Sequence, residues 1–177
     1  MLSDLARIRS IANYQFGEGC GEVIFPDNVT ISYSKNTGRI RHIYLGNILL
    51  ATLKPTNGLF SITLEGGARL LECPSFKSIV KVKDEVAEFI MKGRSLFAKH
   101  VLEADGGIRP GEEVVVVDSN REIVGVGKAI LNGIEMLVFK RGVAVKIRKG
   151  GKKKRRGRVV HSNLSINLVF LLVYPLL

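Results

Sequence analysis

Hydrophobic and polar positions recur with two different periods along the chain, and each period predicts one type of secondary structure. Near the N-terminus, Leu5, Ile8 and Ala12 recur at helical spacing behind Ser3, a residue type that caps helices. We therefore expect a first helix that ends in the glycine-rich run 16–21. Because that run follows a helix and precedes a predicted strand, we expect it to reverse the chain rather than to cradle a phosphate.

From residue 29 onward the pattern changes to alternation of apolar and polar positions, which is typical of half-buried strands. Strands are predicted at 29–33, 39–45, 48–53 and 60–64, with turns between them at 35–38, 46–47 and 55–58. Four strands joined by short turns predict an antiparallel meander with one face in water. The first helix and a short one near 68–71 can cover its other face.

After Cys73-Pro74 the chain predicts many short strands around one helix. That helix begins at a capping Asp84, has the apolar stripe Val86, Phe89 and Ile90, and ends at Gly93 in the left-handed conformation. Strands are predicted at 78–82, 96–102, 114–117, 123–131, 136–139 and 143–147. The run 114–117 is apolar throughout, which predicts a strand covered on both faces.

Glycine and asparagine positions suggest how these strands connect. Asn132-Gly133 is predicted to form a hairpin turn, and Gly125 and Gly127 predict the sharp bend that a small closed barrel requires. The predicted fold class is therefore α+β, with an α+β domain at 1–75, a small barrel at 76–149 and a tail at 150–177.

The charge of the chain is concentrated at its C-terminal end. The net charge is +11, and seven cations without any acid lie from Lys149 to Leu177, which leaves +4 for the rest. A surplus of this sign favours polyanionic partners, nucleic acid or anionic lipid. The apolar end 166–177 is shorter than the ~20 residues that cross a bilayer, so no transmembrane span is predicted. For this tail four alternatives stay open: contact with a membrane surface, an added strand, a partner contact or a read-through extension.

The two cysteines, Cys20 and Cys73, belong to no C-x-x-C pair, so the sequence encodes no zinc site, and we expect a reduced, cytoplasmic protein. The first nine residues contain no apolar core of a signal peptide. No pair of acids has a proximity that the sequence establishes, so we expect no catalytic residues and no cofactor.

Exposed cations are predicted in the first domain. Arg39 and Arg41 are two positions apart on a strand and therefore point the same way, and Lys35 lies in the adjoining turn. Two arginines on one face can grip a phosphate, although the same pattern occurs on ordinary solvated sheet faces.

Several motifs, in this order and spacing, resemble the PUA domain at the C-terminus of archaeal archaeosine tRNA-guanine transglycosylases. They are GRSLFAKHV at 93–101, IRPGEEV at 108–114, VGKA at 126–129 and FKRGVAVK at 139–146. The segments 14–19, 34–41 and 57–60 are similar to the pre-PUA domain of the same enzymes.

This resemblance implies a pre-PUA domain followed by a PUA pseudo-barrel that binds RNA, often the acceptor stem of tRNA. It assigns RNA binding to the loop Gly93, Arg94 and Ser95 with Lys99 beyond it, and to Lys140, Arg141 and Gly142 beside the last strand. Phe97 also lies beyond this loop and His100 could contact a phosphate, but for both residues packing inside is the favoured expectation. We expect the two glycine turns to converge into a basic groove.

The catalytic barrel and zinc site of the transglycosylases have no counterpart in this sequence, so the chain is expected to be non-catalytic by itself. It would act in RNA modification alone or with a separately encoded enzyme. Two alternatives remain, a catalytic subunit or small enzyme of RNA base modification, and an assembly factor whose groove binds protein.

Overall fold

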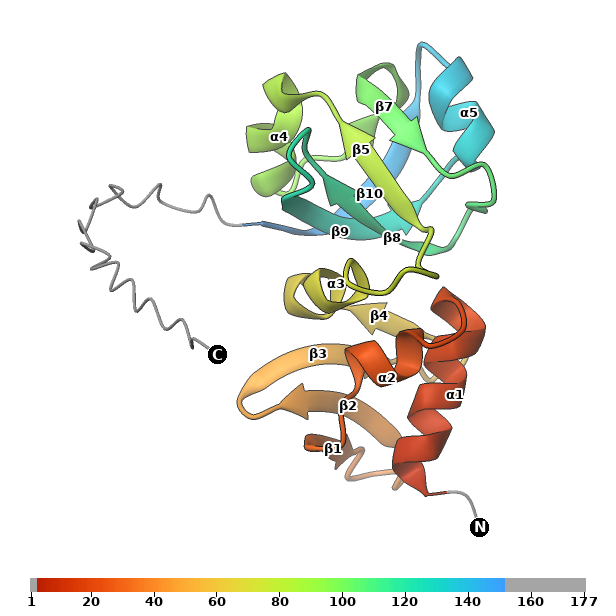
Figure 1. The fold of residues 1–177 in the computed structure, drawn as a ribbon, viewed down its shortest axis with the longest axis vertical. Coiled ribbons are helices and arrows are strands. Elements are labelled where there is room, and N and C mark those ends of the chain that lie inside the picture. The colour runs from red at the N-terminus through yellow and green to blue at the C-terminus, as the bar shows by residue number, and fades with distance from the viewer. Residues whose placement is uncertain (1–2, 152–177) are drawn as a thin grey trace, which may run out of the picture.

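A computed structural model describes residues 3–151 and places them in two halves, each built around one sheet (Figure 1). The predicted tail 150–177 therefore lies outside the described residues except for its first two glycines. No helix within 3–151 is long and apolar enough to cross a membrane.

The first half is the predicted antiparallel meander, with strand order β1-β2-β3-β4. Its strands are β1 (Val29–Tyr33), β2 (Ile40–Leu45), β3 (Ile48–Leu53) and β4 (Phe60–Ile62). Its helices are α1 (Asp4–Phe16), α2 (Cys20–Ile24) and α3 (Leu64–Leu70). Helix α1 begins as predicted, because the Ser3 side chain accepts a hydrogen bond from the backbone of Ala6.

The glycine-rich run after α1 reverses the chain, as predicted, but it leads into the short helix α2 rather than into a strand. Gly17 has a φ of 115°, and a Cβ there would meet the carbonyl of Ser75. A Cβ on Gly21 would collide with the backbone of Arg9 on α1. Gly17 and Gly21 therefore allow close packing, whereas the Cβ position of Gly19 between them has no atom within 4 Å.

The second half is a six-stranded sheet in the order β6-β10-β9-β8-β5-β7. Its strands are β5 (Ile79–Val82), β6 (Leu96–Phe97), β7 (Val101–Ala104), β8 (Glu113–Val117), β9 (Ile123–Ala129) and β10 (Val143–Gly150). Its helices are α4 (Asp84–Met91), the 3₁₀ helix η1 (Ala98–His100) and α5 (Gly133–Val138). The two edge strands β6 and β7 are joined through η1, so the sheet curls toward closure. This confirms the predicted α+β fold class and the pseudo-barrel.

The structure corrects the prediction for residues 132–139. Asn132 does not open a hairpin; it caps α5, and its side chain accepts from the backbone of Glu135 while the Glu135 carboxylate accepts from the backbone of Asn132. This reciprocal capping box satisfies two backbone donors and favours a helix where a strand was predicted. The predicted strand 96–102 is likewise broken by η1.

The start of α4 also differs from the prediction. Lys83 is the N-cap residue, and Asp84 turns its carboxylate away from the helix to accept hydrogen bonds from the backbone and the hydroxyl of Ser119. These hydrogen bonds lower the pKa of Asp84 below its usual value of 3.8.

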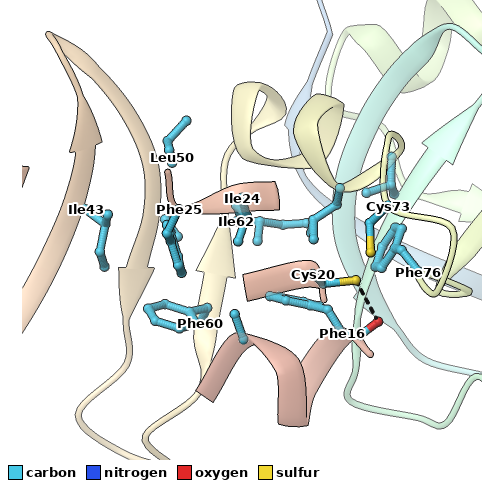
Figure 2. Packing of buried hydrophobic residues seen from close by; sticks show 14 of the residues in the cluster. Phe16, Cys20, Ile24, Phe25, Ile43, Leu50, Phe60, Ile62, Cys73 and Phe76 are labelled. Carbon is cyan, nitrogen blue, oxygen red and sulfur yellow. Dashed lines mark hydrogen bonds between the residues drawn. The ribbon is translucent and has the colours of Figure 1, made fainter. Parts of the chain in front are cut away.

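The core of the first half extends into the second sheet. Aromatic rings form its centre (Figure 2), with the rings of Phe25 and Phe60 edge to face at 5.0 Å. Val115, Val117 and Val126 of the second sheet belong to the same buried cluster. The apolar run of β8 is buried along its whole length, as predicted, because each of its faces lies in a different core.

A buried carboxylate joins the two halves. Glu113 on β8, with 3% of its side chain exposed, lies 2.7 Å from Arg148 on β10 and 3.3 Å from Lys54 beyond β3. Glu113 also accepts from the backbone N–H of Ile62, and Arg148 donates to the carbonyl of Ile62. Glu113 and Arg148 therefore provide hydrogen-bond partners for the outward backbone N–H and C=O groups of Ile62 at the outer edge of β4.

Candidate nucleic-acid interface

The loop after α4 has a backbone fixed by glycine. Lys92 ends the helix and Gly93 follows with a φ of 81°, as predicted. The N–H of Gly93 donates to the carbonyl of Ile90 and that of Arg94 to the carbonyl of Phe89, which together form a Schellman motif. No atom lies within 4 Å of the position that a Cβ on Gly93 would take, so this loop is open on its outer side.

The segments that follow the two predicted glycine turns meet as neighbouring strands. Phe97 of β6 is paired with Val143 of β10, and Leu96 with Val145. The N–H of Ala98 donates to the carbonyl of Gly142 at 3.0 Å. Gly142 therefore lies beyond the Phe97 end of this short ladder, whereas Gly93 lies beyond the Leu96 end. The two glycines flank the ladder instead of facing each other across it.

A cleft of about 650 Å³ lies between α4 and the segment that follows it. Its walls include Arg94, Ser95 and Lys99 of the predicted site, whereas Lys140, Arg141 and Gly142 do not line it. The structure thus brings the two groups onto adjacent segments, and it places only the first group in the cleft.

Two aromatic side chains in the cleft walls correct the sequence prediction. Phe97, expected to pack inside, is 48% exposed, and Phe89, expected on the buried stripe of α4, is 57% exposed. The eight-residue helix buries only Val86, Ala87 and Ile90. Leu96 and Ala98 are buried on either side of Phe97, so strand alternation was the signal that placed Phe97 outside.

His100 and Glu85 are two further polar residues in the cleft walls. The imidazole Nδ1 lies 3.6 Å from a Glu85 carboxylate oxygen, is buried, and has no hydrogen-bond partner among residues 3–151. The expectation that His100 packs inside is correct in part, because 23% of its side chain remains exposed. Glu85 is an acid in the cleft wall that sequence reasoning did not assign to the site.

The predicted cations of this region are exposed and available to a ligand. Arg94, Lys99, Lys140 and Arg141 are all exposed, and within the described part of the chain none has a side-chain hydrogen bond or ion pair. Because no acidic side chain of the described residues neutralises these four cations, they can attract an external anion.

The cations predicted in the first half lie elsewhere. Lys35, Arg39 and Arg41 are exposed around the β1–β2 turn. The Tyr33 hydroxyl just before this turn donates to Asp4 at the start of α1, 2.7 Å away. Helix α1 runs from that end toward the second half (Figure 1), so these three cations are remote from Arg94 and Arg141.

Among residues 3–151 there is no group of three or more His, Cys, Asp or Glu side chains that could hold a metal ion. Cys20 and Cys73 are both buried and free. Burial, and then the neighbouring Cys73 thiol, raise the pKa of Cys20 to about 12.

Two known protein families match consecutive segments of the chain. Residues 6–77 match the patch-forming domain C2 of tRNA-guanine transglycosylase, and residues 78–151 match the PUA domain.

Curated relatives agree with these matches. The chain is 43% identical over 153 residues to the tRNA-guanine(15) transglycosylase of Methanothermobacter thermautotrophicus. This aligned region covers 85% of this chain and 23% of that protein. It is 45% identical over 149 residues to the enzyme of the same name from Thermoplasma volcanium, with coverage of 83% and 23%. The chain thus spans about a quarter of the length of these relatives.

Solved structures support the fold. A hypothetical protein from Pyrococcus horikoshii superposes with a TM-score of 0.67 at 22% identity, covering 86% of this chain and 94% of that one. A PUA domain protein from Thermoplasma acidophilum gives 0.64 at 22% identity, covering 86% and 93%.

Proposed function

Since the chain is a PUA-domain protein that resembles the C-terminal region of the tRNA-guanine(15) transglycosylases, we propose that it binds RNA through the face around α4, β6 and the start of β10. The finer proposal is that the RNA is a tRNA, held at its acceptor stem. The chain would not be catalytic by itself, and it would act in RNA modification in the cytoplasm, alone or with a separately encoded enzyme.

One observation carries this proposal. Arg94 and Lys99 lie on one segment, Lys140 and Arg141 on the neighbouring one, and all four are exposed without an acidic partner in the described chain. Each contact between such a cation and a phosphate releases a counterion, so this arrangement favours a phosphate-rich ligand.

The shape of the face favours a folded RNA helix over single bases. Gly93 and Gly142 both have positive φ and open space where a side chain would be, so a sugar-phosphate backbone can approach the main chain closely. A-form RNA is recognised mostly by its shape and its phosphates. Phe89 and Phe97 add an apolar surface beside the cations.

Lys35, Arg39 and Arg41 would make a second, separate contact with RNA. Because they lie at the far end of the first half, only an RNA long enough to reach both ends can use them together with Arg94. A short acceptor-stem duplex should therefore be insensitive to their replacement, whereas a whole tRNA should not.

The test is tRNA binding by a variant in which Arg94, Lys99 and Arg141 are all alanine. A matched control replaces Arg7, Lys77 and Lys128 with alanine, because these residues are also exposed and their loss removes the same charge. Since each lost phosphate contact reduces the slope of log K against log salt by about 1, we expect the slope to fall by about 3 for the site variant. Binding equal to the parent at near-physiological salt would show that the face is wrongly assigned.

Two further measurements separate the alternatives. Nucleoside mass spectrometry after incubating the protein with tRNA would reveal a modified base if the chain were itself an enzyme. Binding to a cellular partner that is unchanged by added salt and by RNase treatment would favour the assembly-factor function.

A further inference from the structure

The two outer edges of the first sheet differ in whether side chains bind their outward backbone groups. On β4, the outward backbone groups of Phe60 are bound by the side-chain amide of Gln15, and those of Ile62 by Glu113 and Arg148. These three side chains take the place of a fifth strand, so nothing else can pair with this edge.

Strand β1 forms the opposite edge, the one farthest from the second sheet (Figure 1), and it pairs with β2 alone. The N–H of Ser34 donates to the carbonyl of Arg39 and therefore faces β2. Because backbone groups alternate in direction along an antiparallel strand, those of Ile31 and Tyr33 point away from the sheet, whereas the N–H of Val29 already donates to the carbonyl of Pro26 at 3.3 Å.

The protection of the β1 edge is limited to its short length of five residues and to a register shift between Ser32 and Tyr33 in its ladder with β2. Val-Thr-Ile-Ser-Tyr contains no proline, no glycine and no charge, and its β-branched and aromatic residues favour strand pairing. The side chains of Val29 and Ile31 pack against the core under the helices, so a further strand here would extend that core. Tyr33 is 48% exposed and would be covered.

We propose that β1 is a self-association surface, on which a second copy of the chain adds its own β1 antiparallel to form a continuous eight-stranded sheet. If Ile31 lies opposite Ile31 of the second copy, Val29 pairs with Tyr33 and Asp27 lies opposite Lys35, twice by symmetry. The charges that flank β1 are thus self-complementary in this register.

Both flanking side chains are available for that contact. Asp27 is 90% exposed, and one of its oxygens accepts from Arg9 at 2.9 Å, which leaves the other free. Lys35 is exposed in the β1–β2 turn, with no side-chain hydrogen bond or ion pair in the described part of the chain. An interface this small makes a weak dimer, and it leaves the cleft beside α4 free. The inference does not depend on RNA binding at that cleft, but the dimer would engage Lys35, which the proposed second RNA contact also uses.

The experiment is sedimentation equilibrium of RNA-free protein up to several hundred micromolar. Lys35→Asp converts two opposite-charge pairs into two like-charge pairs, so the dimer dissociation constant should rise about 10- to 30-fold. The double variant Asp27→Lys with Lys35→Asp exchanges the charges and should restore part of the affinity, because it also removes the ion pair of Asp27 with Arg9. Lys128→Asp makes the same change of net charge on an exposed position of β9 and should have no effect.

Hydrogen exchange locates the interface independently of these variants. In the dimer, the amides of Ile31 and Tyr33 should gain protection. A monomer at all concentrations would overturn the proposal, as would equal effects of the Lys35 and Lys128 variants. Protection that appears at the exposed apolar residues of α5 (Ile134, Leu137 and Val138) instead of at β1 would also refute it.

Discussion

Replacing Glu113 with alanine tests how the two halves of the molecule are joined. Its carboxylate is 3% exposed and is the common partner of Arg148, Lys54 and the N–H of Ile62. The substitution removes the only negative charge of this cluster and leaves a backbone donor without its acceptor.

The magnitude follows from the burial of the partners. Breaking a buried ion pair by removing one member typically costs about 3–5 kcal/mol, because a charge is left uncompensated. Arg148 and Lys54 are 38% and 29% exposed, so water can partly solvate their charges. We therefore expect the lower end of that range, about 3 kcal/mol, including the cost of about 1 kcal/mol or more for the orphaned N–H of Ile62.

The assay is urea unfolding followed by far-UV circular dichroism, since the chain has four tyrosines and no tryptophan. Glu103→Ala is a matched control, because its ion pair with Lys81 has a similar length of 2.9 Å but its side chain is 71% exposed. That control should cost at most about 1 kcal/mol. A loss for Glu113→Ala no larger than for Glu103→Ala would refute the structural role of the buried charge.

Three further results are expected. Ser119→Ala should return the pKa of Asp84 toward 3.8 in an NMR titration. Since that pKa is lowered in the folded protein, the ionised Asp84 carboxylate contributes to folding stability above pH 3.8, and this contribution is lost as the pH falls through the lowered pKa. The thiols of Cys20 and Cys73 should react with a disulfide reagent at pH 8 only after unfolding, because both are buried and the pKa of Cys20 is about 12. Gly127→Ala should lower the unfolding free energy by about 2 kcal/mol or more in the same urea assay, because a Cβ there collides with the backbone of β10.

The first sheet could be predicted from sequence because its rules are local. Alternation fixed the four strands, and short turns between them left only an antiparallel meander. The cap at Ser3 is likewise a contact between residues three positions apart. Such features depend on neighbours in the chain, which the sequence displays directly.

The segment 132–139 was predicted wrongly because two local signals compete there. Asn-Gly is a strong hairpin signal, whereas Asn132 with Glu135 three positions later is a capping box. Burial decides between them, because a Cβ on Gly133 would collide with the carbonyl of Asp105, so this glycine serves close packing of α5 and not a turn.

The candidate site was predicted as a set of residues but not as a surface. The resemblance named Arg94, Lys99 and Arg141, and all three are exposed, while their role in binding stays a prediction. The exposure of Phe89 could not be read from helical spacing, because an eight-residue helix against a curled sheet buries a narrower stripe than its apolar residues suggest.

The junction between the halves escaped prediction for a different reason. In the sequence, Glu113 reads as one of two adjacent acids before an apolar strand, a position typical of the surface. Its partners lie 35, 51 and 59 residues away, so no local rule could reveal that they converge. Because this cluster and the shared apolar core hold the first sheet against the second, they also set the separation between the cations near Lys35 and those near Arg94. A partner that contacts both groups must therefore match a spacing that is set by buried residues belonging to neither group.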